Sequence, residues 1–210
     1  MANVYLDIET LPGSEYPSLD EIQTPSNYKD EAKIQAYKEA KLDEVYRQQA
    51  LDSMQGRILC IGVAVEDEEP HTFYTYGENE WDALLELKRV IDFLKSSPTF
   101  IGHNVKNFDL QWIWRHAARL GLKHLCNRIP RHKFSDRVQD TAEIWAGPDF
   151  KAVCSLDRIA AFLGIDGKGE MDGSMVYDAF MAGEHEKIRS YCADDVRLTR
   201  SVYKALPDGK

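Results

Sequence analysis

Two carboxylates near the N-terminus, Asp7 and Glu9, stand two residues apart in the apolar segment 3–10. Valine, tyrosine, leucine and isoleucine in this segment predict a β-strand, and alternation along a strand puts Asp7 and Glu9 on one face. Buried carboxylates without a counter-charge are costly, and a divalent cation suits carboxylate oxygens. The pair therefore indicates a metal site, unless the strand frays there and both side chains face water.

A further carboxylate interrupts an apolar helical stripe close to the C-terminus. Residues 184–206 have helical spacing, and Ile188, Asp195 and Val202, seven residues apart, fall on one face. An isolated carboxylate on a buried stripe is seldom structural unless it has a partner. Tyr191 lies one turn before Asp195 on the same face, where it is either an ordinary core tyrosine or part of a site.

In the segment 102–110, polar residues lie between an expected strand and an expected helix. Asp109 falls in the first turn of that helix, where the helix dipole alone stabilises a carboxylate. His103 and Asn104 stand at the strand end, where histidine and asparagine commonly serve as satisfied polar or turn residues. None of these three residues indicates chemistry by itself.

An expected alternation of strands and helices must position these side chains. Two strands form an antiparallel hairpin, and the later strands are connected through helices. This order predicts an α/β mixed sheet in which an antiparallel meander is followed by parallel strands flanked by helices. Residues 138–145 are compatible with either a strand or a helix. The other expected segments are strands at 57–65, 72–76 and 99–104, and helices at 81–94, 107–120, 155–164 and 184–206.

Residues 14–56 are expected to form a loop and helical insertion after the first strand. Turn residues are followed by a weakly amphipathic helix within 28–52, which has too little apolar surface for the main core. Nine acidic and five basic residues lie between Gly13 and Asp52. Because the insertion leaves and re-enters the sheet beside Asp7, we expect it to act as a lid or a contact surface there.

Length and composition fit one globular domain spanning residues 1–210. The chain is 43% hydrophobic, and its formal net charge of −9 argues against binding nucleic acid through a broadly basic surface. The charge is uneven, since residues 115–137 contain seven lysines or arginines, three histidines and one acid. Such a segment either borders an anionic substrate or forms a solvated face.

The cysteines and the N-terminus predict a cytoplasmic protein. The four cysteines are widely spaced with no Cys-x-x-Cys pair, so neither a zinc site nor a disulfide framework is expected. The N-terminus does not have the basic and apolar regions of a secretory signal. The longest apolar run, residues 58–65, is too short to span a bilayer, and no membrane partner is expected.

Three segments together resemble the motifs of the 3′–5′ exonucleases of the DEDD superfamily, which have a ribonuclease H-like fold. A tyrosine four residues before the last aspartate is typical of the DEDDy type, and the histidine of the other type would stand at Ser190. The closest resemblance is to stand-alone relatives of the family-B DNA polymerase proofreading domain. The three motifs are Asp7-Ile8-Glu9-Thr10, Asn104 with Phe108-Asp109, and Tyr191 with Asp195. Further segments similar to that branch are Gly56-Arg57-Ile58, Ser155-Leu156-Asp157 and Asp172-Gly173-Ser174.

The resemblance implies a metal-dependent exonuclease that acts from the 3′ end of single-stranded nucleic acid, DNA more than RNA, and releases nucleoside monophosphates. Asp7, Glu9, Asp109 and Asp195 would hold two Mg²⁺ or Mn²⁺ ions, because such hard cations suit all-oxygen ligands. Asp7 would bridge both ions, Glu9 and Asp195 would complete the ion on the nucleophile side, and Asp109 would hold the other. Tyr191 would orient the attacking water.

The resemblance also implies contacts with the terminal nucleotide, with Leu11 wedged near the last base. The residues implied in substrate binding are Thr10, Leu11, His103, Asn104 and Phe108. Two other functions stay open, namely a metal-dependent nucleotidase or oligonucleotidase and an inactive nucleic-acid-binding module on the same fold. The negative net charge is compatible with the first, whereas the presence of all four carboxylates disfavours the second. No protein partner is indicated.

Overall fold

The chain is built around a mixed β-sheet in a computed structural model that describes residues 1–94, 96–132, 135–149, 152, 154–167, 169 and 171–207. In this part of the chain five strands lie in the order β3–β2–β1–β4–β5. Their bounds are Asn3–Leu11 for β1, Arg57–Val65 for β2, His71–Tyr74 for β3, Thr99–Gly102 for β4 and Val138–Asp140 for β5. Residues 133 and 134 of the basic segment 115–137 lie outside the described residues.

The strand directions confirm the predicted α/β mixed sheet. Strands β1, β2 and β3 form an antiparallel meander, whereas β4 pairs parallel with β1 and β5 pairs parallel with β4. The central strand β1 is therefore flanked on both sides, and its Asp7 lies opposite Gly62 of β2. This position puts the first pair of carboxylates in the middle of the sheet.

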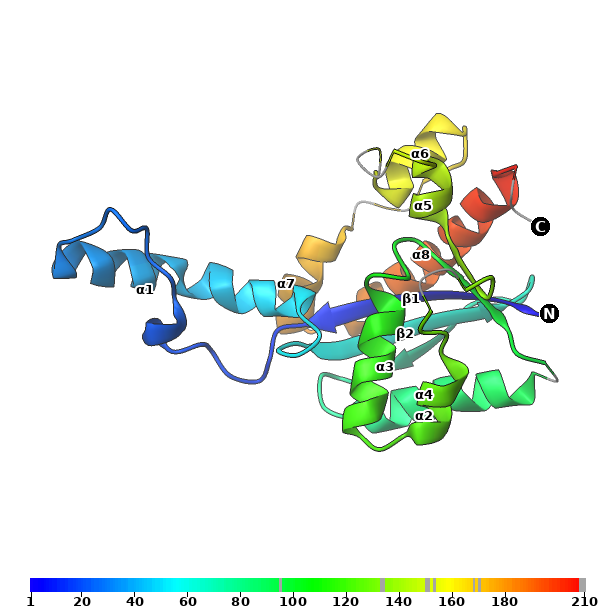
Figure 1. The fold of residues 1–210 in the computed structure, drawn as a ribbon, viewed down its shortest axis with the longest axis horizontal. Coiled ribbons are helices and arrows are strands. Elements are labelled where there is room, and N and C mark those ends of the chain that lie inside the picture. The colour runs from blue at the N-terminus through cyan, green and yellow to red at the C-terminus, as the bar shows by residue number, and fades with distance from the viewer. Residues whose placement is uncertain are drawn as a thin grey trace.

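Helices cover both faces of the sheet (Figure 1). Along β1, Leu6 and Ile8 pack into the core beneath the three helices on one face, while Tyr5 packs with Val196 and Tyr203 on the other. Asp7 and Glu9 alternate with Ile8, so they belong to the face of Tyr5. The helices of the first face are α2 (Glu80–Phe93), α3 (Asp109–Arg119) and α4 (Lys123–Arg128), and the opposite face carries α8 (His185–Ala205).

Three short helices complete the α8 side. The ambiguous segment 138–145 contains both a strand and a helix, because β5 ends at Asp140, whose carboxylate then caps α5 by accepting from Ala142 N. Residues of α6 pack against α8, and residues of α7 pack near the end of β1. Their bounds are Thr141–Ala146 for α5, Leu156–Phe162 for α6 and Val176–Met181 for α7. Within the described part of the chain, no helix has both the length and the apolar character needed to cross a bilayer.

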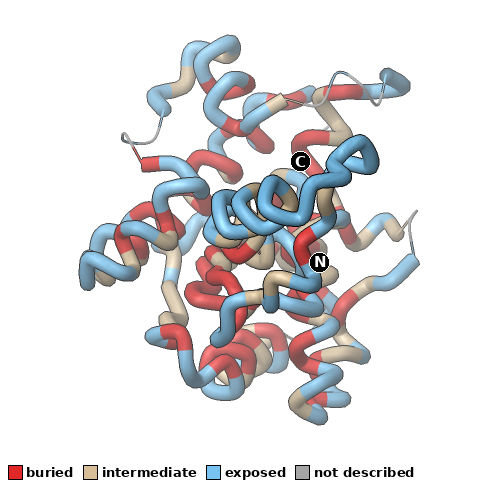
Figure 2. The backbone as a smooth tube through the Cα atoms, turned by 90° about the vertical axis from the view of Figure 1, so that its left-hand side faces the viewer, coloured by how far each residue is buried: buried red, intermediate tan, exposed pale blue. Residues whose placement is uncertain are grey.

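The insertion leaves the sheet after β1 and returns at β2. Its helix α1 (Glu31–Gln48) extends away from the sheet in Figure 1, and it presents a largely exposed surface in Figure 2. Tyr46 is its one buried residue, and the Tyr46 hydroxyl donates to Gly13 O at 2.9 Å. Short 3₁₀ turns at Leu19–Glu21 and Gln49–Leu51 precede and follow the helix.

Two local expectations need correction. The helix expected from residue 107 begins at Asp109, since the side-chain amide of Asn107 donates to Asn104 Oδ1 at 3.1 Å and Phe108 holds the cap position of α3. Strand β3 ends at Tyr74 instead of Tyr76, because the next residues turn and Tyr76 has a φ of 54°. In both cases a local turn replaces the regular element that the sequence pattern predicted.

Candidate active site

Helix α8 lies unusually close to the centre of the sheet. A Cβ atom on Gly62 would be only 2.9 Å from both Cys192 Sγ and Val196 Cγ2, so a larger residue at this position would push the helix away. Gly62 is the β2 neighbour of Asp7, and Asp195 lies on the same helix between Cys192 and Val196. The close approach therefore brings the third-motif carboxylate down to the first-motif strand.

Asp109 joins this group through the backbone of β1. Its Oδ1 accepts a hydrogen bond from Ile8 N at 2.9 Å, and the side chain is buried at the start of α3. The pKa of Asp109 is raised to about 7, mainly by burial and also by the charges of Asp140 and Asp195, although the hydrogen bond from Ile8 opposes the rise. Asp109 is therefore more than an ordinary helix-start aspartate.

A hollow of about 230 Å³ opens over these carboxylates, and we call it the acidic hollow. Nine of the ten residues implicated by the sequence line it, which brings the three motifs together at one place. These nine are Asp7, Glu9, Thr10, His103, Asn104, Phe108, Asp109, Tyr191 and Asp195.

Leu11 is the exception, and its expected role as a wedge beside the last base is wrong. Its side chain is 0% exposed and packs in a cluster with Leu59, Val176 and Ile188. It does not line the acidic hollow. The cause is the packing of residues from α7 and α8 over the end of β1, which buries the Leu11 side chain.

The turn between β4 and α3 is held by Asp140, a residue that the sequence did not single out. The two carboxylate oxygens of Asp140 accept from Asn104 N at 2.8 Å and from Lys106 N at 3.1 Å. These bonds stabilise the left-handed conformation of Asn104, whose φ is 57°. In the sequence, Asp140 could be noticed as an acid two residues after the apolar Val138. That pattern predicts a helix cap as readily as a residue that holds a turn.

His103 lines the acidic hollow with both ring nitrogens engaged by the protein. Its Nδ1 lies 2.9 Å from Thr141 Oγ1, and its Nε2 lies 3.0 Å from Cys154 O. The ring is thereby fixed against α5 and the segment before α6.

Tyr191 lies next to the carboxylates as a neutral phenol. Burial raises its pKa well above the usual range, and the negative charges of Glu9, Asp195 and Asp7 raise it further. A hydrogen bond with Asp195 acts in the same direction. At neutral pH the hydroxyl therefore keeps its proton and serves as a hydrogen-bond donor.

The donor atoms of the acidic hollow fit a hard divalent cation. Ligand atoms of Asp7, Glu9 and Cys192 lie within 4.8 Å of one another. The Cys192 thiol is fully buried, and its hydrogen bond with Cys60 together with burial raises its pKa well above the usual value, so it stays protonated. Protonated thiols are poor ligands and hard cations prefer oxygen, so the carboxylates are the fitting donors.

The insertion also reaches the acidic hollow, which the sequence did not indicate residue by residue. Ala50 and Leu51, at the end of the insertion, and Gly173 from the segment before α7 line it as well. Thr10 connects the two regions, because its hydroxyl donates to Ala50 O at 2.6 Å. The expected proximity of the insertion to the first motif is confirmed.

Comparisons with known proteins agree with this geometry. A family model described as a predicted 3′-5′ exonuclease related to the exonuclease domain of PolB matches residues 49–206. These residues include the second and third motifs, whereas the first motif lies before them. Among curated protein sequences, none matches the chain.

The fold is shared with a much larger solved structure. The family B DNA polymerase from the hyperthermophilic archaeon Pyrobaculum calidifontis matches with a TM-score of 0.59 and 16% identity, over 100% of this chain and 26% of the polymerase chain. The present chain thus spans about a quarter of the polymerase's length. At this identity the likeness shows the fold alone, and it agrees with the predicted ribonuclease H-like architecture.

Proposed function

Because the chain belongs to the family of predicted 3′–5′ exonucleases related to the exonuclease domain of PolB, we propose that it removes 3′-terminal nucleotides from single-stranded nucleic acid. DNA is the favoured substrate, RNA is the second, and the products are nucleoside monophosphates. One observation carries the proposal: Asp7, Glu9, Asp109, Tyr191 and Asp195 all line one hollow of about 230 Å³. We further propose that residues 1–210 act as one exonuclease domain.

The four carboxylates of the acidic hollow would hold two divalent cations, Mg²⁺ or Mn²⁺. Such ions, when bound, supply an activated water and neutralise charge on the phosphate and the leaving oxygen. The donor set supports them, since it offers carboxylate oxygens from three elements, with Asp7 and Glu9 close together.

The protein's own residues would orient the reaction. Ile8 N fixes one oxygen of Asp109, and Asp140 fixes the turn that carries Asn104. The protonated Tyr191, which is hydrogen-bonded to Asp195 before substrate binds, would help to position a water or a phosphate oxygen without taking a proton from it. Phe108 and Asn104 line the same hollow, where they can contact sugar and base.

A ladder assay tests the proposed reaction. Single-stranded DNA and RNA 20-mers labelled at the 5′ end are incubated with the protein in Mn²⁺, in Mg²⁺ or in excess EDTA. We expect progressive shortening from the 3′ end in either metal and none in EDTA. Asp195→Asn should abolish the ladder, whereas Asp194→Asn should retain it, because Asp194 pairs with Arg197 at 2.7 Å outside the acidic hollow. Intact oligonucleotides in Mn²⁺, or shortening in EDTA, would overturn the proposal.

The net charge of −9 is compatible with a second candidate function, namely that of an oligonucleotidase that acts on very short substrates. Comparing kcat/KM on a 20-mer with that on a dinucleotide distinguishes the two. A preference for the dinucleotide would favour the second candidate.

We also propose a cytoplasmic location, which the four free cysteines support.

A further inference from the structure

Leu51 is an exposed leucine beside a charged site. The residue is 72% exposed, yet it lines the acidic hollow together with Asp7, Glu9 and Phe108. Leu11, by contrast, is fully buried. An apolar side chain held in water at the edge of four carboxylates is not explained by the core, and none of the proposed steps uses it.

The turn that carries Leu51, residues 49–56, is attached to β1 and the segment after it. Thr10 Oγ1 donates to Ala50 O at 2.6 Å, and Gly13 N donates to Gln49 Oε1 at 3.0 Å. A Cβ atom on Gly56 would lie 2.5 Å from Gln49 O and 2.7 Å from Leu11 O, so the turn closes tightly on the strand end. Leu51 is therefore presented from a fixed backbone.

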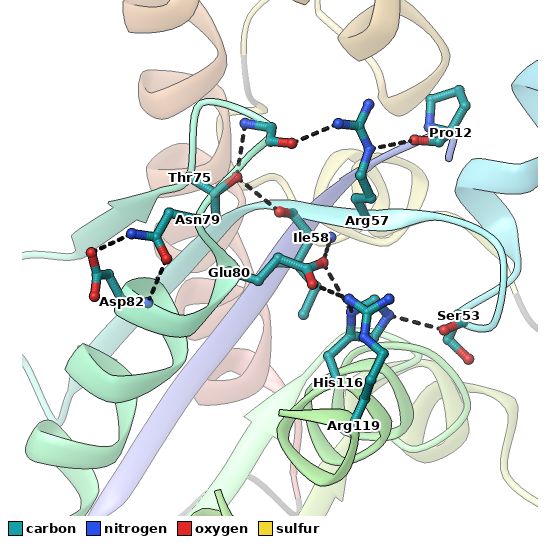
Figure 3. Close-up of polar contacts among 11 residues, drawn as sticks. Pro12, Ser53, Arg57, Ile58, Thr75, Asn79, Glu80, Asp82, His116 and Arg119 are labelled. Carbon is teal, nitrogen blue, oxygen red and sulfur yellow. Dashed lines mark hydrogen bonds and ion pairs between the residues drawn. The ribbon is translucent and has the colours of Figure 1, made fainter. Parts of the chain in front are cut away.

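A buried polar network also holds this turn, through contacts with Ser53 (Figure 3). His116 Nε2 lies 2.9 Å from Ser53 O, and His116 Nδ1 lies 2.9 Å from a carboxylate oxygen of Glu80. Glu80 also accepts from Ile58 N at 2.6 Å, and Arg115 donates to Ser53 Oγ. The turn is thus connected to α2, α3 and β2, and a rigid turn loses little conformational entropy when its leucine makes a contact.

We propose that Leu51 contacts the 3′-terminal nucleobase, so that the insertion supplies the apolar part of the substrate site. This inference rests on the exonuclease function proposed above. Carboxylates suit the metal and phosphate side of a nucleotide, whereas the face of a base is its least polar surface and packs against apolar side chains. Leu51 and Phe108 are apolar residues that line the same hollow as the carboxylates. The hollow therefore offers apolar contacts for a base and acidic groups for the metal and phosphate part of a nucleotide.

Met54 provides a matched control. It belongs to the same turn and is 84% exposed, but it does not line the acidic hollow. Single exposed apolar residues are common on protein surfaces. A surface leucine without a ligand would therefore behave like Met54 when it is shortened, and a base contact would not.

The test combines these variants with two substrates. Leu51→Ala, Leu51→Phe and Met54→Ala are compared with the parent on a DNA 20-mer and on the same strand with an abasic 3′-terminal nucleotide. We expect Leu51→Ala to lower kcat/KM on the normal strand about three- to thirtyfold, mainly through KM, because the isopropyl group that would be buried against the base is lost. Leu51→Phe should retain the parent value, and Met54→Ala should leave it unchanged.

The abasic strand decides the assignment. Removal of the base should lower the parent's kcat/KM, and Leu51→Ala should cause no further loss on that strand, because the contact is already absent. An equal loss on both strands, or no loss on either, would overturn the inference while the exonuclease activity of the parent still stands. A loss with Met54→Ala as large as that with Leu51→Ala would overturn it as well. A parent inactive on all strands would overturn the function itself.

Discussion

Two buried acidic regions of this molecule are built in opposite ways. Around Glu80, burial raises the carboxyl pKa, but His116, Ile58 N and Arg119 together outweigh burial, so the pKa of Glu80 is lowered. In the acidic hollow, burial and the charges of neighbouring carboxylates together raise the pKa of Asp109 to about 7. One region carries its own counter-charges, whereas the other gathers like charges.

The difference distinguishes a network that stabilises local structure from a group of carboxylates that suits a bound cation. A buried carboxylate that is fully bonded to cations and donors stabilises a fixed local structure, here the turn that ends the insertion. Carboxylates that repel one another reduce stability unless a cation from solution joins them. The Glu80 network is therefore structural, and the acidic hollow has the electrostatics of a binding site.

The largest expected effect is the loss of exonuclease activity when a carboxylate of the acidic hollow is removed. Asp7→Ala and Asp195→Ala each remove a proposed metal ligand, and exonuclease activity should fall to background, more than about 10³-fold. Circular dichroism and thermal unfolding should show intact folds. Retention of a tenth of the parent rate by either variant would contradict the assignment of that carboxylate.

Removing the carboxylate of the Glu80 network should instead affect stability. Glu80→Ala leaves His116 and Arg119 without their partner and should lower the free energy of unfolding by about 3–5 kcal/mol. Glu86→Ala is a control on the same helix, because its pair with Arg89 is exposed, and it should cost less than about 1 kcal/mol. Urea unfolding at pH 7 measures both, and equal losses would contradict the contrast.

The stability contributed by Glu80 should depend on pH with a definite sign. Its folded-state pKa lies below the ordinary value of 4.5, so its contribution is present above that value and is lost as the pH falls through the folded-state pKa. The difference in unfolding free energy between the parent and Glu80→Gln should therefore shrink below about pH 4.5. A difference that grows on acidification would contradict the network described here.

Tyr191→Phe should have a smaller effect on activity than loss of a metal ligand. The phenol is protonated at neutral pH and contributes one hydrogen bond, and loss of one well-placed donor costs about 10²–10³ in rate at most. The variant should keep measurable activity and the acid limb of the parent's pH–rate profile. A variant as inactive as Asp7→Ala would mean that Tyr191 takes part in proton transfer.

The smallest expected effect is stabilisation by metal. Mn²⁺ at 100 times its dissociation constant should add about 2.7 kcal/mol to the unfolding free energy of the parent, because only the folded chain has the site. The shift should be much smaller in Asp7→Asn. Without metal, Asp7→Asn should be at least as stable as the parent, since one repelling charge is removed, and thermal unfolding with and without Mn²⁺ measures both effects.

The sequence predicted those parts of the site that regular elements position. Alternation along β1 and the seven-residue spacing along α8 correctly put Asp7, Glu9 and Asp195 on inward faces. Local sequence did not identify Asp109 as more than a helix-start residue, because its bond to Ile8 joins residues far apart in the chain. Only the resemblance of the three motifs brought it into the predicted site.

The two leucines show why the rest was not predictable. Leu11 belongs to the strand that carries the acids, but the register of β1 shifts between Glu9 and Thr10, and residues of α7 and α8 bury Leu11. Leu51 ends a short 3₁₀ turn, and the position of the segment 49–56 depends on contacts with Thr10, His116 and Glu80. Neither packing over a strand end nor a turn held by distant partners leaves a periodic pattern in the sequence.

Equilibrium binding of Mn²⁺ tests the contrast between the two acidic regions most directly. Dialysis of the parent, Asp7→Asn and Glu80→Gln against Mn²⁺ gives the number of bound ions and their affinities for each protein. The parent should bind two ions, Glu80→Gln should bind both with the parent's affinities, and Asp7→Asn should lose at least one. A parent that binds no Mn²⁺, or an Asp7→Asn variant that binds as the parent does, would contradict the assignment of the acidic hollow as a metal-dependent active site.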